Sequence, residues 1–298
     1  MREFRLIDGS NMIFRAYYGL PELHNDEWEN INAVYGFFRM LLRMLQAKPE
    51  YLMIARDSPV RTVRAEIFTD YKAQRISMPD NFFWQMNMIK ELTAQLHIPA
   101  EEIPGFEADD IIFSLVQHAK HHQHSLLFKI ISSDKDLKQM LSDNVIAFDA
   151  MKQKITTYES FKQEFGFIPE HIVDYLAIVG DVSDNVPGIQ GIGEKWAKEL
   201  VSTHQTLENI YANLEAIAPR YQQKLRDGKE VAFASRELIR LIDIPALAHK
   251  WVDAFLYALD GAHWKNVLVE GQWFASLEQL CGDFKIHPHV GQQHSLFW

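Results

Sequence analysis

The sequence is short of cysteine and of long apolar segments. Among its 298 residues there is one cysteine, Cys281, which cannot form a disulfide within the chain, so we expect a reducing compartment. No apolar run approaches the roughly 18 residues that a membrane-spanning helix needs, and Tyr175–Val179 is typical of the longest. The first residues, Met1–Arg5, lead at once to Asp8 and do not form a secretory signal. We therefore expect a cytoplasmic protein with no membrane contact.

Composition and charge narrow the class of protein further. Hydrophobic residues make up 47% of the chain and charged residues 23%, which fits globular domains and excludes a disordered or collagen-like protein. The net charge is −10, whereas nucleic-acid binders are usually basic. Nine acids, however, recur in short clusters, and without them the chain holds 31 acidic residues against 30 basic ones. Global charge therefore does not exclude a nucleic-acid partner.

The first part of the chain alternates strand-like and helix-like segments. We expect strands at Phe4–Ile7, Tyr51–Ala55 and Leu126–Ile131, and further strand with a turn within 145–158. We expect helices at Ile31–Leu45, Phe83–Leu96, Asp109–Ala119 and Leu137–Leu141. This alternation indicates an α/β fold with a mostly parallel central sheet flanked by helices. After about Gly166 helical segments dominate, so we divide the chain into residues 1–170 and a helical region, 171–298.

Acidic residues follow the expected strands of the first domain. Asp8 follows the first strand, Asp57 the second, and Asp134 and Asp136 the third. Ligands of open parallel sheets bind beyond the carboxyl ends of the strands, so we expect these carboxylates at one edge.

Two helix ends supply five more acids. Glu107, Asp109 and Asp110 begin one expected helix, and Asp181 and Asp184 share a face at the end of another if its helical turn persists. Any one of these acids could be a cap or a solvated side chain. Together they need cations, because two like charges ~4 Å apart repel by about 1 kcal/mol even in water. All-oxygen ligands fit Mg²⁺ or Mn²⁺, and two such ions are a recurring arrangement for phosphodiester cleavage.

Basic residues begin four positions beyond Asp57. Arg61, Arg64, Lys72 and Arg75 would fall along one stripe of a helix with Phe68, and the neighbouring Tyr71 could stack on a base. An exposed amphipathic helix is the alternative. The position beside the acids favours a surface that grips a polyanion.

Glycines and lysines follow Asp184. Gly188, Gly191 and Gly193 allow close approach of a phosphate to a helix N-terminus, and Lys195 and Lys198 add charge in its first turns. This pattern resembles a helix-hairpin-helix, which reads a duplex backbone without sequence preference. A plain helix-capping loop is the alternative.

Assembled, these motifs resemble the 5′ nuclease family, which includes the N-terminal domain of bacterial DNA polymerase I and flap endonucleases. The resemblance spans about residues 4–245. It is carried by Leu6–Ser10 with Arg15–Tyr18, Tyr71–Arg75, Pro104–Asp110, Ser133–Leu137 and Val179–Gly188 running into Gly191–Gly193. The chain departs from the family at Arg56, before the acid at 57, and at Ser58–Val60 after it. After about residue 245 the resemblance ends, and we expect a stand-alone nuclease without a polymerase domain.

The resemblance implies a helical arch over the active site and a helix-three-turn-helix DNA module. It implies that two divalent metals, Mg²⁺ or Mn²⁺, are surrounded by nine acids: Asp8, Asp57, Glu107, Asp109, Asp110, Asp134, Asp136, Asp181 and Asp184. It further implies that Lys72 and Arg75 contact the scissile phosphate as catalytic residues. A K⁺ ion on backbone carbonyls of the hairpin is also implied.

These observations predict a Mg²⁺-dependent 5′-3′ exonuclease and flap endonuclease. It would be a monomeric hydrolase of DNA replication and repair that acts on single-strand/duplex junctions, with a DNA polymerase as a partner in trans. The predicted DNA contacts are Arg61, Arg64, Tyr71, Gly188, Gly191, Gly193, Lys195 and Lys198. A branched-DNA-binding protein with little catalysis is the main alternative. A related metal-dependent RNase is another, although the hairpin gives it no support.

Overall fold

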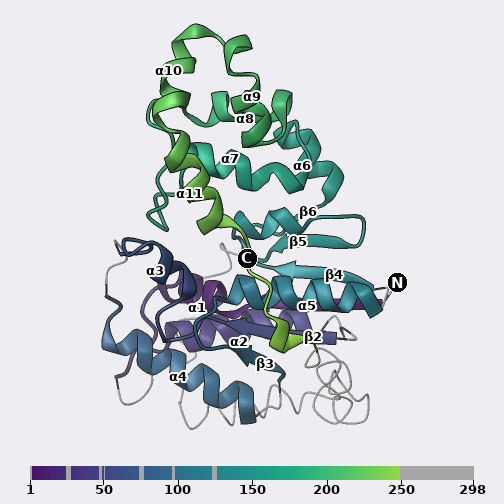
Figure 1. The fold of residues 1–298 in the computed structure, drawn as a ribbon. Coiled ribbons are helices and arrows are strands. Elements are labelled where there is room, and N and C mark those ends of the chain that lie inside the picture. Colours follow the sequence, from purple (N-terminus) through teal and green to yellow (C-terminus); the bar gives the residue numbers. More distant parts are fainter. Residues whose placement is uncertain are drawn as a thin grey trace.

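A six-stranded sheet forms the centre of the first part of the chain (Figure 1). The structure is a computed structural model, and it describes residues 2–24, 28–46, 49, 51–73, 77–95, 98–122 and 126–248. The strand order is β3-β2-β1-β4-β5-β6, and every neighbouring pair is parallel except β5 with β6. The strands are β1 (Arg2–Asp8), β2 (Tyr51–Arg56), β3 (Ala100–Glu102), β4 (Leu126–Ile131), β5 (Val145–Asp149) and β6 (Lys154–Thr156). The predicted parallel sheet is confirmed, and β3 is an edge strand that the sequence pattern missed.

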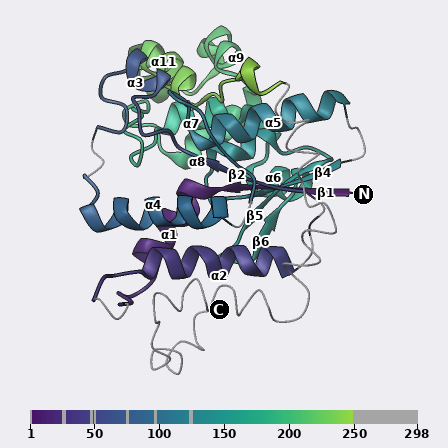
Figure 2. The ribbon, with the colours of Figure 1, turned by 90° about the horizontal axis from the view of Figure 1, so that it is seen from below.

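Helices cover the two faces of this sheet (Figure 2). The helices of the first part are α1 (Gly9–Gly19), α2 (Asn32–Gln46), α3 (Val63–Ile67), α4 (Asp80–Gln95) and α5 (Ala108–His122). Because side chains alternate along a strand, Ile7 of β1 packs with α1, α2 and α4, whereas Leu6 packs with α5 on the other face. The strands are therefore buried on both sides, as is usual for parallel sheets.

The second half of the described chain is helical, as predicted. Its α-helices are α6 (Tyr158–Phe165), α7 (Ile172–Val179), α8 (Glu194–His204), α9 (Leu207–Ala212), α10 (Pro219–Asp227) and α11 (Lys229–Ile239). The short 3-10 turns are η1 (Asp136–Met140), η2 (Pro169–His171), η3 (Leu214–Ala216) and η4 (Pro245–Leu247). In Figure 1 these helices stack above β4–β6 around the buried α7. Among the described residues no helix is long and apolar enough to cross a membrane.

The segment between β2 and α4 corrects one prediction. A single helical stripe from Arg61 to Arg75 does not form, because α3 ends at Ile67 and the chain then turns. Lys72 lies in that turn with a left-handed φ of +56°, which a continuing helix does not allow. Arg75 falls outside the described residues. The predicted arch also falls on this segment and stays a prediction.

After α11 the chain returns to the sheet. Ile244 and Leu247 are buried in the same apolar cluster as Ile112 of α5. The last described residues of the helical region are therefore packed directly on the helix whose first turn holds the predicted ligands Asp109 and Asp110.

Candidate metal centre and hairpin

Asp8 and Asp57 meet where β1 and β2 end. Asp8 caps α1, because its carboxylate accepts a hydrogen bond from the backbone N–H of Asn11 at 3.0 Å and another from the Ser132 hydroxyl at 2.8 Å. The Asp57 carboxylate accepts from the N–H of Ala108 at 2.8 Å, which joins the end of β2 to the start of α5. The local folding of three segments thus brings both acids to one edge.

Burial raises the pKa of several acids at this edge. Desolvation, followed by the charges of Asp57 and Asp134, raises the pKa of Asp8 to about 7. Burial, partly offset by the nearby charge of Arg64, also raises the pKa of Asp109 well above its ordinary range. Raised values of this kind mean that the ionised forms are costly here unless a cation is bound.

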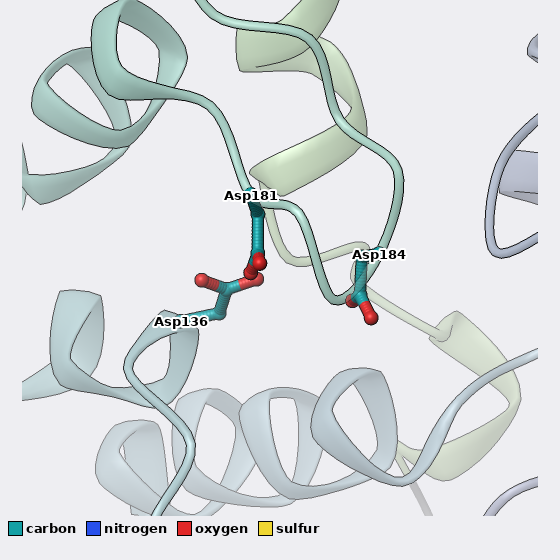
Figure 3. Close-up of side chains that lie close together, drawn as sticks. All are labelled: Asp136, Asp181 and Asp184. Atoms are coloured by element: carbon teal, nitrogen blue, oxygen red, sulfur yellow. The ribbon is translucent and has the colours of Figure 1, made fainter. Parts of the chain in front are cut away.

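Asp136, Asp181 and Asp184 form the tightest acidic group (Figure 3). One carboxylate oxygen from each lies within 4.8 Å of the others. Figure 3 shows Asp181 pointing at Asp136 from the turn above it. Burial, with the charges of Asp134 and Asp184, raises the pKa of Asp136 well above its ordinary range. Its Oδ1 is buried and has no hydrogen-bond partner among the described residues.

The turn that carries Asp181 and Asp184 differs from the prediction. Helix α7 ends at Val179, Gly180 takes a φ of +82°, and Asp181 forms an antiparallel bridge with Val186. The two acids therefore converge through a turn and not along one helical face. Burial favours the protonated form of Asp181, but hydrogen bonds from Ser183 and Lys135 outweigh it and hold its pKa below the ordinary value.

This donor set fits a hard divalent cation. The three close carboxylates offer oxygen ligands, which Mg²⁺ and Mn²⁺ prefer. The orphaned Oδ1 of Asp136 is a buried acceptor that such a cation would satisfy. Asp136, Asp181 and Asp184 are therefore the residues best placed to hold a metal, and Asp134 lies next to them, with its carboxylate accepting from the N–H of Asp136 at 2.9 Å.

Glu107 and Asp110 are held by cations of the chain itself. The Arg64 guanidinium donates to both Asp110 oxygens at 2.6 and 2.7 Å and to Glu107 at 3.2 Å. Arg64 is only 2% exposed, so its guanidinium faces these two acids and not the surface where the predicted DNA contact would lie. The sequence spacing predicted an exposed position for Arg64, but its ion pair with Asp110 is buried.

Tyr71 and Lys72 also face this acidic edge. The Tyr71 ring is buried, and its hydroxyl donates to Glu107 at 3.1 Å. Its stacking on a base stays a prediction. The Lys72 ammonium lies 2.7 Å from Glu107 and 3.7 Å from Asp184. The Lys72 ammonium therefore lies between an acid of the first turn of α5 and an acid of the turn after α7. Arg61, in contrast, is exposed, and its guanidinium donates to the Ala65 carbonyl.

The predicted hairpin lies between α7 and α8. Gly188 packs so closely on α7 that a Cβ would lie 2.3 Å from the Val179 carbonyl oxygen, and Gly191 has a φ of +79°. Gly193 caps α8 without a side-chain hydrogen bond. Lys195 is exposed in the first turn of α8, whereas the Lys198 ammonium donates to the Glu164 carbonyl. The geometry is that of a helix-hairpin-helix with a bare helix N-terminus, which can receive an anion.

Some residues of these sites were missed by the sequence reasoning. Lys135 forms a 3.0 Å ion pair with Asp181, and its position between two predicted ligands could have indicated it. The Lys224 ammonium of α10 donates to the Gly191 carbonyl at 3.0 Å. Nothing in the sequence places α10 beside the hairpin, so that contact depends on the tertiary fold.

Comparisons with known sequences cover most of the chain. Residues 3–166 match the profile of the "5'-3' exonuclease, N-terminal resolvase-like domain", and residues 167–258 match the "5'-3' exonuclease, C-terminal SAM fold". A 5'-3' exonuclease of Aquifex aeolicus is 38% identical over 245 residues, which are 82% of this chain and 84% of that protein. DNA polymerase I of Borreliella burgdorferi is 41% identical over 246 residues, which are 81% of this chain but 27% of the polymerase.

Solved structures share the fold. The D15 protein of phage T5, co-crystallised with metal ions, superimposes with a TM-score of 0.68 at 21% identity, over 85% of this chain and 93% of that one. The T5 D15 flap endonuclease in a complex with DNA and metal ions gives 0.67 at 23% identity, over 90% and 98%. The catalytic core of Rad2 with a DNA substrate gives 0.51 at 16% identity, over 85% and 77%.

Proposed function

The chain belongs to the 5'-3' exonuclease family, and from this we propose that it is a structure-specific 5′ nuclease of DNA replication and repair. It hydrolyses phosphodiester bonds at 5′ flaps and 5′ ends of DNA. The observation that carries the proposal is the acidic edge of the sheet, where three carboxylates lie within 4.8 Å and a buried carboxylate oxygen lacks a partner among the described residues.

The proposed cofactors are two divalent cations, Mg²⁺ or Mn²⁺. Asp136, Asp181 and Asp184 would hold one of them, and Asp8, Asp57, Asp109 and Asp134 lie along the same edge to complete the set. When bound, such ions supply a more acidic water and offset the charge that develops on the phosphodiester. Lys72 holds its ammonium at this edge and is proposed to orient the scissile phosphate, together with Arg75.

The hairpin is proposed to hold the duplex part of the substrate. The bare N-terminus of α8, with Gly188, Gly191, Gly193 and Lys195, offers backbone N–H groups and charge to phosphates. Lys198 and Arg61 are proposed as flanking contacts, and K⁺ on hairpin carbonyls as a further ligand. We propose that residues 1–170 supply most of the metal site, to which the turn after α7 adds Asp181 and Asp184, and that the helices of residues 171–298 bind the duplex.

The partner polymerase is proposed to act in trans in the cytoplasm. The match to DNA polymerase I of Borreliella burgdorferi covers 27% of that protein. The nuclease is proposed to be a monomer, and hydrolysis would leave a 5′-phosphate on the trimmed strand and a 3′-hydroxyl on the released fragment.

A labelled 5′-flap duplex tests the proposal. We expect Mg²⁺-dependent cleavage near the junction by the wild-type protein, none in EDTA, and roughly 10³-fold slower cleavage by Asp136→Asn. Asp143→Asn is a matched control, because Asp143 is exposed in the turn before β5. Flap binding in EDTA without turnover after Mg²⁺ is restored would contradict the proposal and favour a binding protein. An RNA flap run in parallel separates a DNA nuclease from an RNase, because only RNA carries the 2′-hydroxyl.

A further inference from the structure

Arg64 uses its whole guanidinium within the chain. Its Nε donates to the Leu238 carbonyl at 2.8 Å, and its Nη2 donates to the Arg240 carbonyl at 2.8 Å as well as to Asp110. Its Nη1 donates to Asp110 and Glu107. A guanidinium has five N–H donors, and these contacts occupy all five. None is left for a DNA phosphate.

Asp110 is just as fully engaged. It is 1% exposed, and besides both Arg64 bonds its carboxylate accepts from the N–H of Ile242 at 2.8 Å and from that of Glu107 at 3.3 Å. An ionised carboxylate offers about four acceptor positions. With four donors on Asp110, the remaining capacity for a metal lies with its neighbours.

The Ile242 contact belongs to a segment, residues 238–244, that we call the strap; it comprises the last two residues of α11 and the chain that leads from them back to the sheet. Its carbonyls at Leu238 and Arg240 accept from Arg64, and its N–H groups at Ile242 and Ile244 donate to Asp110 and to the Ser114 hydroxyl. A single ion pair therefore joins three elements that are far apart in sequence: α3, the first turn of α5, and the strap.

We propose that the Arg64–Asp110 pair is a positioning element that couples the metal centre to the docking of the helical region. On one side Arg64 binds Glu107, which also contacts Lys72 and Tyr71. On the other side Arg64 binds the carbonyls of the strap. Asp110 then serves the metals through these contacts and not as a direct ligand. Removing one partner of a buried ion pair leaves the other charge uncompensated, so the effect reaches both sides. The inference rests on the proposed metal-dependent function.

The decisive variant is Arg64→Lys, which keeps the charge but loses the forked geometry. We expect its affinity for Mn²⁺ alone, measured by electron paramagnetic resonance, to fall roughly 10- to 100-fold, because support of metal-site residues has effects of this size. Its affinity for a 5′ flap in EDTA stays that of the wild type. Arg236→Lys is the matched control, because Arg236 is likewise buried but pairs with Asp174 of α7 and Glu208 of α9, and its Mn²⁺ affinity is expected to be unchanged.

Two results would overturn the inference. One is an Arg64→Lys protein with wild-type affinity for Mn²⁺, and the other is one that loses only flap affinity, as expected of a DNA contact. A different result would contradict the proposed function alone. In it, Arg64→Lys lowers the affinity for Mn²⁺ as expected, but the wild-type protein cleaves no flap.

A measurement on the wild-type protein covers the case in which Arg64→Lys does not fold. Hydrogen exchange is followed at the amides of Ile242 and Ile244 in the strap, and at Ile210 of α9 as a reference outside it. Coupling predicts that Mg²⁺ slows the strap amides by a larger factor than the reference. Equal slowing, or none at the strap, contradicts the inference.

Discussion

The acidic edge, which is formed by the carboxylates near Asp8 and Asp136, and the hairpin between α7 and α8 differ in the charge that they present. The edge gathers carboxylates that are buried, and burial raises the pKa of Asp8, Asp109 and Asp136. The hairpin uses neutral backbone, glycines and the exposed Lys195. A polyanionic substrate can be met directly by the second surface but only through cations by the first. The comparison predicts that the rate of cleavage depends on the acidic edge and that the affinity for DNA depends on the hairpin.

The largest expected effect separates chemistry from grip. Asp136→Asn removes the charge of a buried metal-site carboxylate, and metal-ion catalysis contributes several kcal/mol, so we expect a roughly 10³-fold loss of flap cleavage. Flap affinity in EDTA stays within about twofold of the wild type, because the hairpin is untouched. Single-turnover cleavage and fluorescence anisotropy measure the two quantities. Equal losses in both would break the comparison.

The hairpin offers a matched pair of glycines. In Gly188→Ala the new Cβ would lie 2.3 Å from the Val179 carbonyl oxygen, whereas at Gly193 a Cβ meets nothing within 4 Å among the described residues. Overpacking costs typically 1–3 kcal/mol, so we expect Gly188→Ala to lower both the free energy of unfolding and flap affinity by that order. Gly193→Ala should leave the free energy of unfolding nearly unchanged. Urea unfolding and anisotropy test this, and similar behaviour of the two variants would refute the assigned packing.

In the absence of divalent cations, the buried acids should make the free energy of unfolding fall as the pH rises. The folded Asp8 has a pKa of about 7, above the ordinary 3.8, so the folded state binds more protons between these values. The free energy of unfolding in EDTA therefore falls as pH rises from about 4 to about 7, by at most about 4 kcal/mol for this group. Because Mg²⁺ offsets the ionised acids, we expect it to raise Tm more at pH 8 than at pH 5.5. Thermal unfolding with a Tm shift independent of pH would contradict this.

The smallest expected effect concerns the exposed lysine of the hairpin. Lys195→Gln should weaken flap binding a few-fold and reduce the slope of log affinity against log salt by about 0.9, the contribution of one phosphate contact. Lys90→Gln is the control, because Lys90 on α4 pairs with Glu102 away from the hairpin. An unchanged slope for Lys195→Gln would remove this residue from the proposed grip.

Local pattern predicted most of the elements because their signals are short-ranged. The strand Leu126–Ile131 matches β4, and the segment 145–158 does contain two strands joined by a turn. The edge strand β3 was missed, since three residues, Ala100–Glu102, carry too little pattern. Helical spacing failed from Arg61 to Arg75, where residues far away in sequence decide the conformation.

The metal centre could be predicted in content but not in arrangement. Asp8, Asp57 and Asp134 could be predicted as site residues because each follows a strand, and the residues that follow parallel strands lie at the same edge of the sheet. That Asp136, Asp181 and Asp184 form the closest set follows from a turn after α7, which helical periodicity misrepresents.

Residue types and their order determined on their own that this chain forms an α/β sheet with carboxylates along one edge, since burial and periodicity act over a few neighbouring positions. Only the tertiary structure decided the fate of each charge. Arg64 was expected at the surface and lies buried between Asp110 and the strap, because a guanidinium is stable in the interior only where partners from distant segments surround it. These partners come from segments that only the packing of the fold brings together, so the sequence around Arg64 does not predict them.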